Sequence, residues 1–455
     1  MKILLVTVDA WRASHASFAS TASDAQPPYT PNLAGLAESG TVFTQAVSHG
    51  PATPYAFPAI HTSSLPLSHG GYERLDEGRT LTSEALSRAG WRCVGIHANP
   101  WLGERYGYAR GYDDYRDVGE FSLPLLDRLR DGLIGRFGLD HPVYRAAQYC
   151  YRYAQQPLAS LGGGGSDEVA TARRALAGAT DRTFVWVHLL TPHAPYTPDE
   201  RYRELMDVPR FEGSATRLTT RAQHDPASLT TTEREAVRRL YAAAVRQADD
   251  EVARIVDAAD DDTLVVVSAD HGEALFEHGQ VGHEPALYDE LLRVPLVVRP
   301  PAGHSPAVGR VDAQVGHVDL GPTILDYAGV DAPDGWVGRS LRPAVDGGEI
   351  GDELAVSEVA STATTPGRID PDALQVAVRT PRRKVIAAAD GAVTGFDLAA
   401  DPGETDPIRE PTGADWNRLR DALAARLDEI DVGGASRVDR DGATERRLRD
   451  LGYLE

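Results

Sequence analysis

Five short runs of branched apolar residues, separated by longer stretches of helical pattern, constrain the fold of this chain most strongly. They cover residues 3–8, 93–97, 184–190, 264–268 and 295–298. Continuous apolar runs of about four to eight residues are typical of strands buried on both faces of a parallel sheet. The sequence therefore predicts an α/β fold in which a mixed, mostly parallel sheet lies between helices.

Helix signals occur between these runs. Thr30-Pro31 supplies a cap and a first-turn proline before a predicted helix over residues 32–38, and a second predicted helix, about residues 83–89, ends at Gly90. Residues 120–165 are predicted to form a helical insertion, which fits a lid, a partner surface or ordinary packing.

The amino-acid composition changes after residue 341, where an acidic and glycine-rich sequence begins. We predict one large domain over residues 1–345 and a small α+β C-terminal subdomain over residues 346–455. Within the subdomain, strands are expected near residues 374–379 and 384–387, and a last helix near 416–430.

The charge balance excludes some partners. The formal net charge is -21, and Lys2 and Lys384 are the only lysines among 46 basic residues. Such a surface repels nucleic acid and anionic membranes. A GC-rich codon bias and adaptation to high salt both favour this composition, so we expect a salt-loving microbe such as a halophilic archaeon.

Cysteine content and hydropathy bear on the compartment. Cys93 and Cys150 allow at most one disulfide and are expected to be reduced thiols. The N-terminal apolar run is too short for a signal peptide, and no stretch reaches the ~18 apolar residues of a membrane span. We therefore expect a cytoplasmic, soluble protein without a transmembrane segment.

Polar chemistry follows three of the predicted strands. Asp9 ends the first run, His193 follows the third, and Asp270-His271 ends the fourth. Catalytic groups gather at the carboxyl ends of parallel strands, and carboxylates with an imidazole suit Mg²⁺, Mn²⁺, Ca²⁺ or Zn²⁺. An aspartate after a strand also often serves only as a helix cap.

Several segments, in order, resemble the sulfatase family of the alkaline phosphatase superfamily. They include Asp9-Ala10-Trp11-Arg12, Thr30-Pro31-Asn32-Leu33, His188 to Tyr196, Asp270-His271-Gly272-Glu273, His278-Gly279, Tyr288 to Pro295, His317 to Thr323, and Phe396-Asp397-Leu398. The resemblance spans nearly the whole chain. It implies an alkaline-phosphatase-like fold, with the sulfatase-like catalytic domain over residues 1–345.

The nucleophile segment departs from the family pattern. Formylglycine sulfatases carry Cys or Ser in a Cys/Ser-x-Pro-x-Arg segment, whereas here Thr53 takes the nucleophile position and Phe57 the arginine position. Threonine does not fit formylglycine maturation. It resembles the phosphodiesterase and phosphoglycerol-transferase branches, in which a metal-activated hydroxyl attacks phosphorus. Thr53 could instead be a plain helix cap, and Ser48 and Thr62 are less favoured nucleophiles.

The resemblance also suggests the remaining site residues. His193 lies in a Pro-His-Ala-Pro-Tyr turn after a predicted strand, where it could donate to a phosphoryl or sulfuryl oxygen or be a structural loop histidine. His283 lies where related enzymes place a Lys or His, and it could bind the ester oxygen or protonate the leaving group. Arg12 would contact the anion or form an ion pair near Asp9. The resulting set of ligands for one divalent metal ion is Asp9, Thr53, Asp270 and His271.

Three further polar residues are expected to have supporting roles. His188 is predicted to be a core histidine, His278 to support the site from behind the metal ligands, and Asp319 to cap a helix.

The predicted activity is hydrolysis or transfer at a sulfate or phosphate ester of a small molecule or glycan. A phosphomutase with a persistent phosphothreonine and a degenerate anion-binding protein are the alternatives. The sequence makes no prediction about the oligomeric state.

Overall fold

The computed structural model describes residues 1–18, 29–69, 71–72, 74–119, 167–304, 309–361 and 370–430. The predicted helical insertion, Cys150 and residues 431–455 lie outside these ranges. The large sheet has the strand order β10-β2-β9-β6-β1-β5-β3-β4. Its strands are β1 Lys2–Val8, β2 Thr41–Val47, β3 Arg92–His97, β4 Asp114–Asp117, β5 Thr183–Leu189, β6 Thr263–Ala269, β9 Leu296–Arg299 and β10 Gly309–Gly316. Only β9 is antiparallel to its neighbours, so the predicted mixed, mostly parallel sheet is confirmed.

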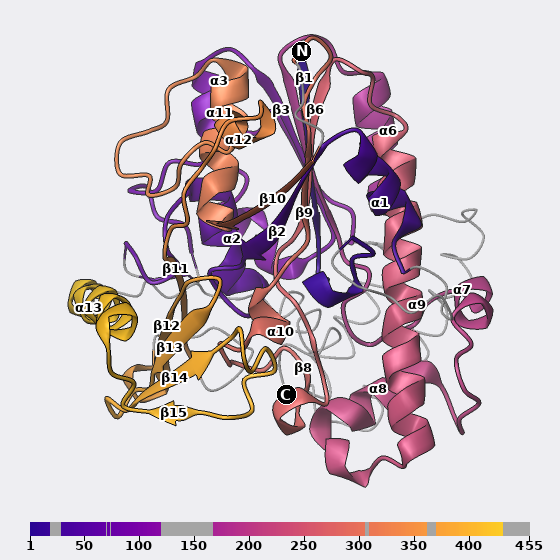
Figure 1. The fold of residues 1–455 in the computed structure, drawn as a ribbon. Helices are drawn as coiled ribbons and strands as arrows, with labels where there is room; N and C mark the ends of the chain where they lie inside the picture. The colour runs from indigo at the N-terminus through magenta and orange to yellow at the C-terminus, as the bar shows by residue number, and fades with distance from the viewer. Residues whose placement is uncertain are drawn as a thin grey trace, which may run out of the picture.

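Helices cover both faces of this sheet. Figure 1 shows α1, α6 and α9 on one side and α2, α3 and α11 on the other, and each group packs together. The helices are α1 Pro31–Glu38, α2 Thr53–Thr62, α3 Thr82–Arg88, α6 Asp167–Ala177, α7 Glu200–Leu205, α8 Ala215–His224, α9 Thr231–Val256, α10 Asp289–Leu292, α11 Leu320–Ala328, α12 Arg342–Val345 and α13 Ala414–Glu429. Because helices cover both faces of the sheet, six of the seven residues of β1 are buried.

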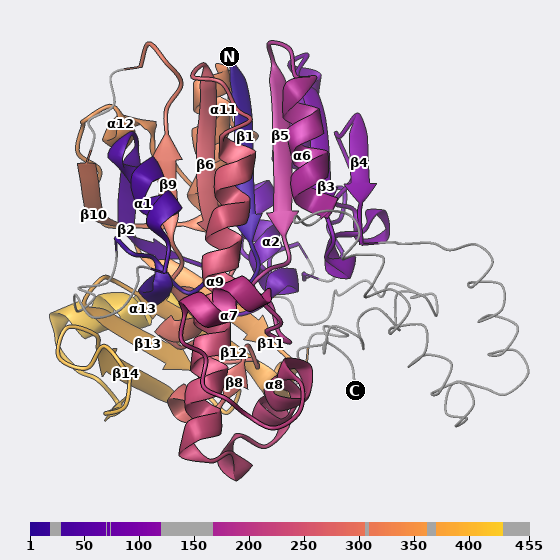
Figure 2. The same ribbon diagram turned by 90° about the vertical axis from the view of Figure 1, so that its right-hand side faces the viewer.

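A second, antiparallel sheet forms the C-terminal subdomain. It contains β11 Ala355–Ala360, β12 Leu374–Arg379, β13 Arg383–Ala387, β14 Val393–Asp397 and β15 Ile408–Arg409, and α13 packs on β12 and β13. A short hairpin, β7 Ala274–Leu275 and β8 Val281–Gly282, follows β6. Figure 2 shows that the arrowheads of β4 and β5 point toward the end of the molecule where β8 and the second sheet lie.

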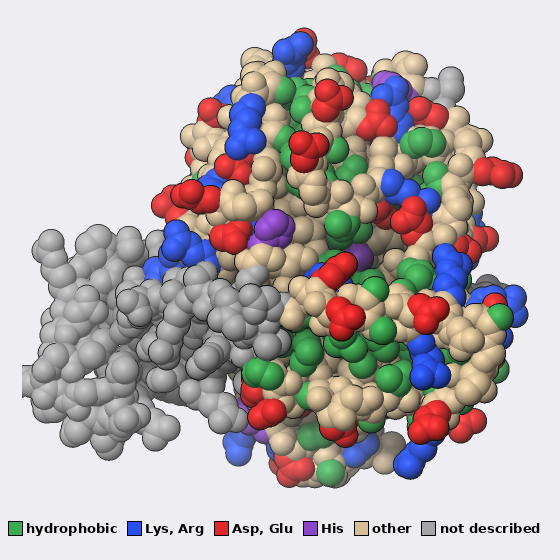
Figure 3. All heavy atoms as spheres, turned by 90° about the vertical axis from the view of Figure 1, so that its left-hand side faces the viewer, with side chains coloured by type: hydrophobic (Ala, Val, Ile, Leu, Met, Phe, Trp, Pro, Cys, Tyr) green, Lys and Arg blue, Asp and Glu red, His purple; other side chains and the backbone are tan. Residues whose placement is uncertain are grey.

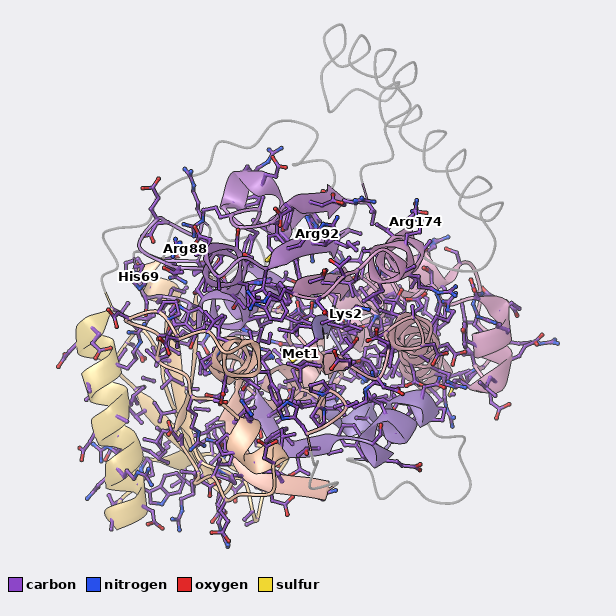
Figure 4. The ribbon with its side chains drawn as sticks, turned by 90° about the horizontal axis from the view of Figure 1, so that it is seen from above. Met1, Lys2, His69, Arg88, Arg92 and Arg174 are labelled. Atoms are coloured by element: carbon purple, nitrogen blue, oxygen red, sulfur yellow. The ribbon has the colours of Figure 1, made fainter. Side chains whose placement is uncertain are left out.

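The opposite end holds the N-terminus. Seen from above in Figure 4, Met1 and Lys2 lie near its middle, and ion pairs join them to Asp262 (2.8 Å) and Asp260 (2.5 Å). Acidic side chains are scattered over the face shown in Figure 3 rather than gathered in one patch. Within the described part of the chain, no helix combines the length and the apolar character needed to cross a bilayer.

Candidate functional site

Two neighbouring strands deliver the predicted metal ligands to one place. Asp9 follows β1, and Asp270 and His271 follow β6, which pairs with β1 in parallel. The Nε2 atom of His271 lies 3.5 Å from Asp9 Oδ1 and 3.6 Å from Asp270 Oδ2, and all three side chains are fully buried. Asp9 Oδ1 and His271 Nε2 have no hydrogen-bond partner. Buried polar atoms without partners are costly, so this cluster fits a bound cation.

Backbone contacts fix the orientation of these ligands. Amides of Ala10 and His271 donate to Asp270 Oδ1 (3.1 and 2.8 Å), which leaves Asp270 Oδ2 for the site. His271 Nδ1 donates to Gly272 O at 2.8 Å, so Nε2 is the nitrogen that can bind a metal. Residue 272 must be glycine, because a Cβ there would lie 2.0 Å from the carbonyl oxygen of Glu290.

Thr53 joins the cluster from the first turn of α2. Its hydroxyl donates to Asp270 Oδ2 at 2.9 Å, and Asn99 Nδ2 donates to the Thr53 hydroxyl oxygen at 3.3 Å. The alternative that Thr53 only caps a helix is wrong, since Ala52 occupies the N-cap position and the hydroxyl is directed to a carboxylate. The hydroxyls of Ser48 and Thr62 donate to backbone carbonyls instead.

Asn99 is a site residue that the sequence reasoning missed. Its Nδ2 donates to Asp9 Oδ2 at 2.9 Å, while its Oδ1 accepts from Trp101 N at 3.0 Å, which fixes the amide. Asn99 follows β3, whose strand was predicted. The rule that polar groups gather after parallel strands would have identified it, had the rule been applied to every predicted strand.

His188 lies inside β5, fully buried, as predicted. Its Nδ1 lies 3.0 Å from Thr7 Oγ1, and its Nε2 lies 3.4 Å from Asp9 Oδ2. It is therefore a core histidine that also borders the site. Phe57, at the position of the missing arginine, packs edge-on against His188 with ring centroids 4.9 Å apart.

Electrostatics also favour a cation here. Burial alone would lower the pKa of His271, but the charges of Asp270 and Asp9 outweigh it and raise the pKa to about 9. Burial would raise the pKa of Asp9, but His193, His188 and His271 hold it well below its usual range. His271 thus balances the charges of Asp9 and Asp270, and a metal ion would displace its Nε2 proton on binding.

His193 and His283 lie together beside the cluster. Their ring centroids are 5.0 Å apart, and that of His283 lies 4.7 Å from the ring of His271. His283 Nδ1 donates to Glu273 Oε2 at 2.9 Å, and the Tyr196 hydroxyl donates to Glu273 Oε1. Glu273 and Tyr196 stood in the matched segments but were assigned no role.

His271, Glu273 and His283 form a second group close enough to hold a metal. However, Glu273 already accepts from His283 and Tyr196, and His271 can offer Nε2 to only one ion. Two carboxylates surround the first position, which makes it the better cation site. Among the described residues, the geometry therefore favours the position between Asp9, Asp270 and His271 over the second group.

Arg12 forms its ion pair with Glu277. Its guanidinium donates to Glu277 Oε1 (2.9 Å) and to the carbonyl oxygen of Glu273 (3.1 Å), and its contact with a substrate anion stays a prediction. Arg12, Arg238 and Arg239 line a cavity of about 220 Å³ between α9 and the loop that follows β1. Asp319 precedes α11 but makes no side-chain cap bond to it. Its carboxylate accepts from Gly316 N, which caps the 3-10 turn His317–Asp319, and from Arg339 N, so the predicted cap forms on that turn.

Comparisons with known proteins agree with this architecture. Among solved structures, the phosphonate monoester hydrolase of Agrobacterium radiobacter aligns with a TM-score of 0.70 and 21% identity, covering 94% of this chain and 95% of that one. Among curated proteins, the multifunctional alkaline phosphatase superfamily protein PehA of Trinickia caryophylli is 25% identical over 402 residues, 75% of this chain and 76% of PehA.

Other relatives match over shorter segments. Choline-sulfatase of Rhizobium meliloti (strain 1021) is 30% identical over 204 residues, which are 42% of this chain and 38% of that protein. The match to the uncharacterized sulfatase YidJ of Escherichia coli (strain K12) covers 21% of that protein. A model of the C-terminal part of N-sulphoglucosamine sulphohydrolase matches residues 277–432, and the sulfatase model matches residues 2–330. Since the sulfatase model covers well over half of the sequence, the chain belongs to the sulfatase family of the alkaline phosphatase superfamily.

Proposed function

We propose that this protein is a metal-dependent hydrolase of phosphate or sulfate esters, with Thr53 as its nucleophile. The observation that carries the proposal is the Thr53 hydroxyl, 2.9 Å from Asp270 Oδ2 and next to the atoms of Asp9 and His271 that lack hydrogen bonds. Asp9, Thr53, Asp270 and His271 would hold one Mg²⁺, Mn²⁺, Ca²⁺ or Zn²⁺ ion. We favour a phosphate ester, because threonine cannot be converted to formylglycine.

Each side chain of the site has a separate role in the proposed reaction. A bound cation would supply positive charge that makes the Thr53 hydroxyl more acidic and offsets the charge of the substrate oxygens. Asp270 Oδ2 accepts the Thr53 proton, and the Asn99 amide orients the oxygen. His193 donates to a non-bridging oxygen of the substrate.

The bonds then change in two steps. Attack forms a bond from Thr53 Oγ1 to phosphorus and breaks the bond to the leaving oxygen, which takes a proton from His283. Glu273 holds the His283 ring in place for this transfer. Water next attacks phosphorus and gives a proton back to His283. The bond from phosphorus to Thr53 Oγ1 breaks, Oγ1 takes back its proton from Asp270, and phosphate is released. A small-molecule ester is supported by the relative named choline-sulfatase, and a glycan ester is the alternative.

The test compares three substrates in high salt: p-nitrophenyl phosphate, bis-p-nitrophenyl phosphate and p-nitrophenyl sulfate. We expect about one metal ion for each chain, and turnover that falls at least about 10³-fold in Thr53→Ala but not in the matched control Thr62→Ala. Strong sulfate turnover with unmodified Thr53 would overturn the preference for phosphorus. A persistent gain of about 80 Da on Thr53 would indicate a phosphomutase, and absence of metal and turnover a degenerate anion-binding protein.

A further inference from the structure

The β7–β8 hairpin holds the Glu273–His283 pair at its base. Glu273 immediately precedes β7 and His283 immediately follows β8, and their 2.9 Å hydrogen bond closes the hairpin. Movement of this hairpin would therefore move the imidazole that faces the rings of His193 and His271. The accuracy with which the leaving oxygen is protonated depends on what holds the hairpin still.

The tip of the hairpin, residues 276–280, has a strained backbone. Phe276 (φ 83°) and His278 (φ 51°) both adopt the left-handed region, although neither is glycine. Such conformations persist only where surrounding contacts enforce them, and they cluster where a precise arrangement matters. Contacts of the tip with its surroundings must therefore hold Phe276 and His278 in these conformations.

His278 makes most of those contacts. Its ring stacks on Tyr288 with centroids 3.6 Å apart and an interplanar angle of 6°. Nδ1 donates to Glu290 Oε1 at 2.7 Å, and Nε2 donates to the carbonyl oxygen of Glu404 at 3.2 Å. Because both partners are acceptors, both ring nitrogens carry protons in this arrangement.

These partners connect the tip to two other parts of the molecule. The backbone carbonyl of Glu290 accepts from Glu273 N at 2.9 Å, so one residue braces both the base and the tip of the hairpin. Glu404 belongs to the C-terminal subdomain, and its carboxylate accepts from Asp289 N (2.6 Å) and pairs with Lys384 (2.6 Å). Figure 1 shows β8 below α10 and beside the second sheet.

We propose that His278 is a positioning residue that fastens the hairpin tip to the C-terminal subdomain and thereby holds His283 where the leaving oxygen takes its proton. The proposal rests on the role of His283 in the proposed function. It gives the subdomain a part in catalysis, although none of the described site residues comes from it. Arg12 anchors the opposite side of the tip through Glu277.

The test uses aryl phosphates whose leaving phenols span a range of pKa values. Wild type, His283→Ala, His278→Ala and the double variant are compared, with His224→Ala, exposed on α8, as the matched control. Loss of a proton donor costs most with poorly leaving phenols. We expect His278→Ala to lower kcat about ten- to hundredfold for those phenols and much less for p-nitrophenol. The double variant should be no slower than His283→Ala.

The results distinguish failure of the proposed role of His283 from failure of the proposed role of His278. If His283→Ala does not steepen the dependence on leaving-group pKa, the proposed role of His283 fails. If His283→Ala steepens it but His278→Ala slows all substrates equally, or behaves like the control, the positioning proposal is overturned. Tyr288→Leu removes the stacking on His278 and the edge contact with Phe396 but keeps the hydrogen bonds of His278. It should give a smaller change of the same pattern, and it replaces His278→Ala if circular dichroism shows that variant to be unfolded.

Discussion

Two clusters of buried or largely buried carboxylates lie at the same end of the large sheet and differ in the positive groups that balance their charge. The site cluster places Asp9 and Asp270 around His271, with separations of 3.5 and 3.6 Å. The junction cluster, formed where α10 meets the second sheet, places Asp289 and Glu404 around Lys384, with Arg379 3.1 Å from Asp289. The junction thus contains permanent cations, whereas the site depends on an imidazole.

The pKa shifts follow from this difference. Burial favours the neutral acid at Asp289, but Arg379 and Lys384 hold its pKa well below the usual range. Burial instead raises the pKa of Asp270, which has no arginine or lysine among its partners. A buried pair that contains its own cation stabilises an interface between elements, and a buried carboxylate pair without one is suited to bind a cation from solution.

The largest effect should come from neutralising the site. Asp270→Asn should lower turnover at least about 10³-fold and remove the bound metal, because it takes away a ligand and the acceptor for the Thr53 proton. The metal-free variant should be at least as stable as metal-free wild type, since the change removes one of two buried like charges. Metal analysis, kinetics and thermal melting check this. Full metal content in the variant would contradict the assignment.

The same change at the junction should have the opposite profile. Asp289→Asn leaves Lys384 and Arg379 short of a counter-charge, and breaking a buried pair costs about 3–5 kcal/mol of unfolding free energy. Metal content should stay at the wild-type level. Urea titration measures the loss, with Asp312→Asn as the control, because the ion pair of Asp312 with Arg310 is exposed and should contribute at most about 1 kcal/mol. Equal losses in both variants would break the contrast between buried and exposed pairs.

Metal removal should weaken the fold through the site alone. At a metal concentration of 100 times Kd, binding adds about 2.7 kcal/mol of stability, which a chelator should remove from wild type. The chelator should remove the same amount of unfolding free energy from Asp289→Asn and almost none from Asp270→Asn. Melting curves with and without chelator measure all three. A chelator effect that persists in Asp270→Asn would place the ion elsewhere.

The sequence predicted those parts of the structure that depend on local pattern. The runs that became β1, β3, β5 and β6 are continuously apolar because both faces of each strand are buried, and their polar ends identified Asp9, Asp270 and His271. The cytoplasmic location and the salt-loving source remain predictions.

What the sequence did not predict depends on contacts between distant segments. The 26-residue helix α9 was missed although Thr230 and Glu233 form a capping box, because its buried face is rich in alanine and gives a weak apolar pattern. Asn99 lies 90 residues from Asp9, and only the sheet order brings them together. The orientation of Arg12 toward Glu277, likewise, is decided by the hairpin that follows β6.

The smallest effect concerns Glu251 on α9, a buried carboxylate outside both clusters. Gln247 donates to its Oε1 at 3.1 Å, the nearest guanidinium, of Arg254, is 3.9 Å away, and Oε2 has no hydrogen bond. Burial raises the pKa of Glu251 to about 7, from an ordinary value of 4.5, and Glu168 adds to the shift.

The sign of the pH effect follows from proton uptake. Between pH 4.5 and 7 the folded protein holds this proton more tightly than the unfolded chain does, so the unfolding free energy contributed by Glu251 falls as pH rises through that window. Glu251→Gln should flatten this part of the slope and stabilise the protein by about 1–2 kcal/mol above pH 7, less than the full shift implies because the new amide is also buried. Urea titrations from pH 4 to 8 measure the slope, and Glu349→Gln, at an exposed position, should keep that of wild type. An unchanged slope in Glu251→Gln would show that a buried carboxylate without a cation can be tolerated outside the site at no cost, and would weaken the argument that the site needs its metal.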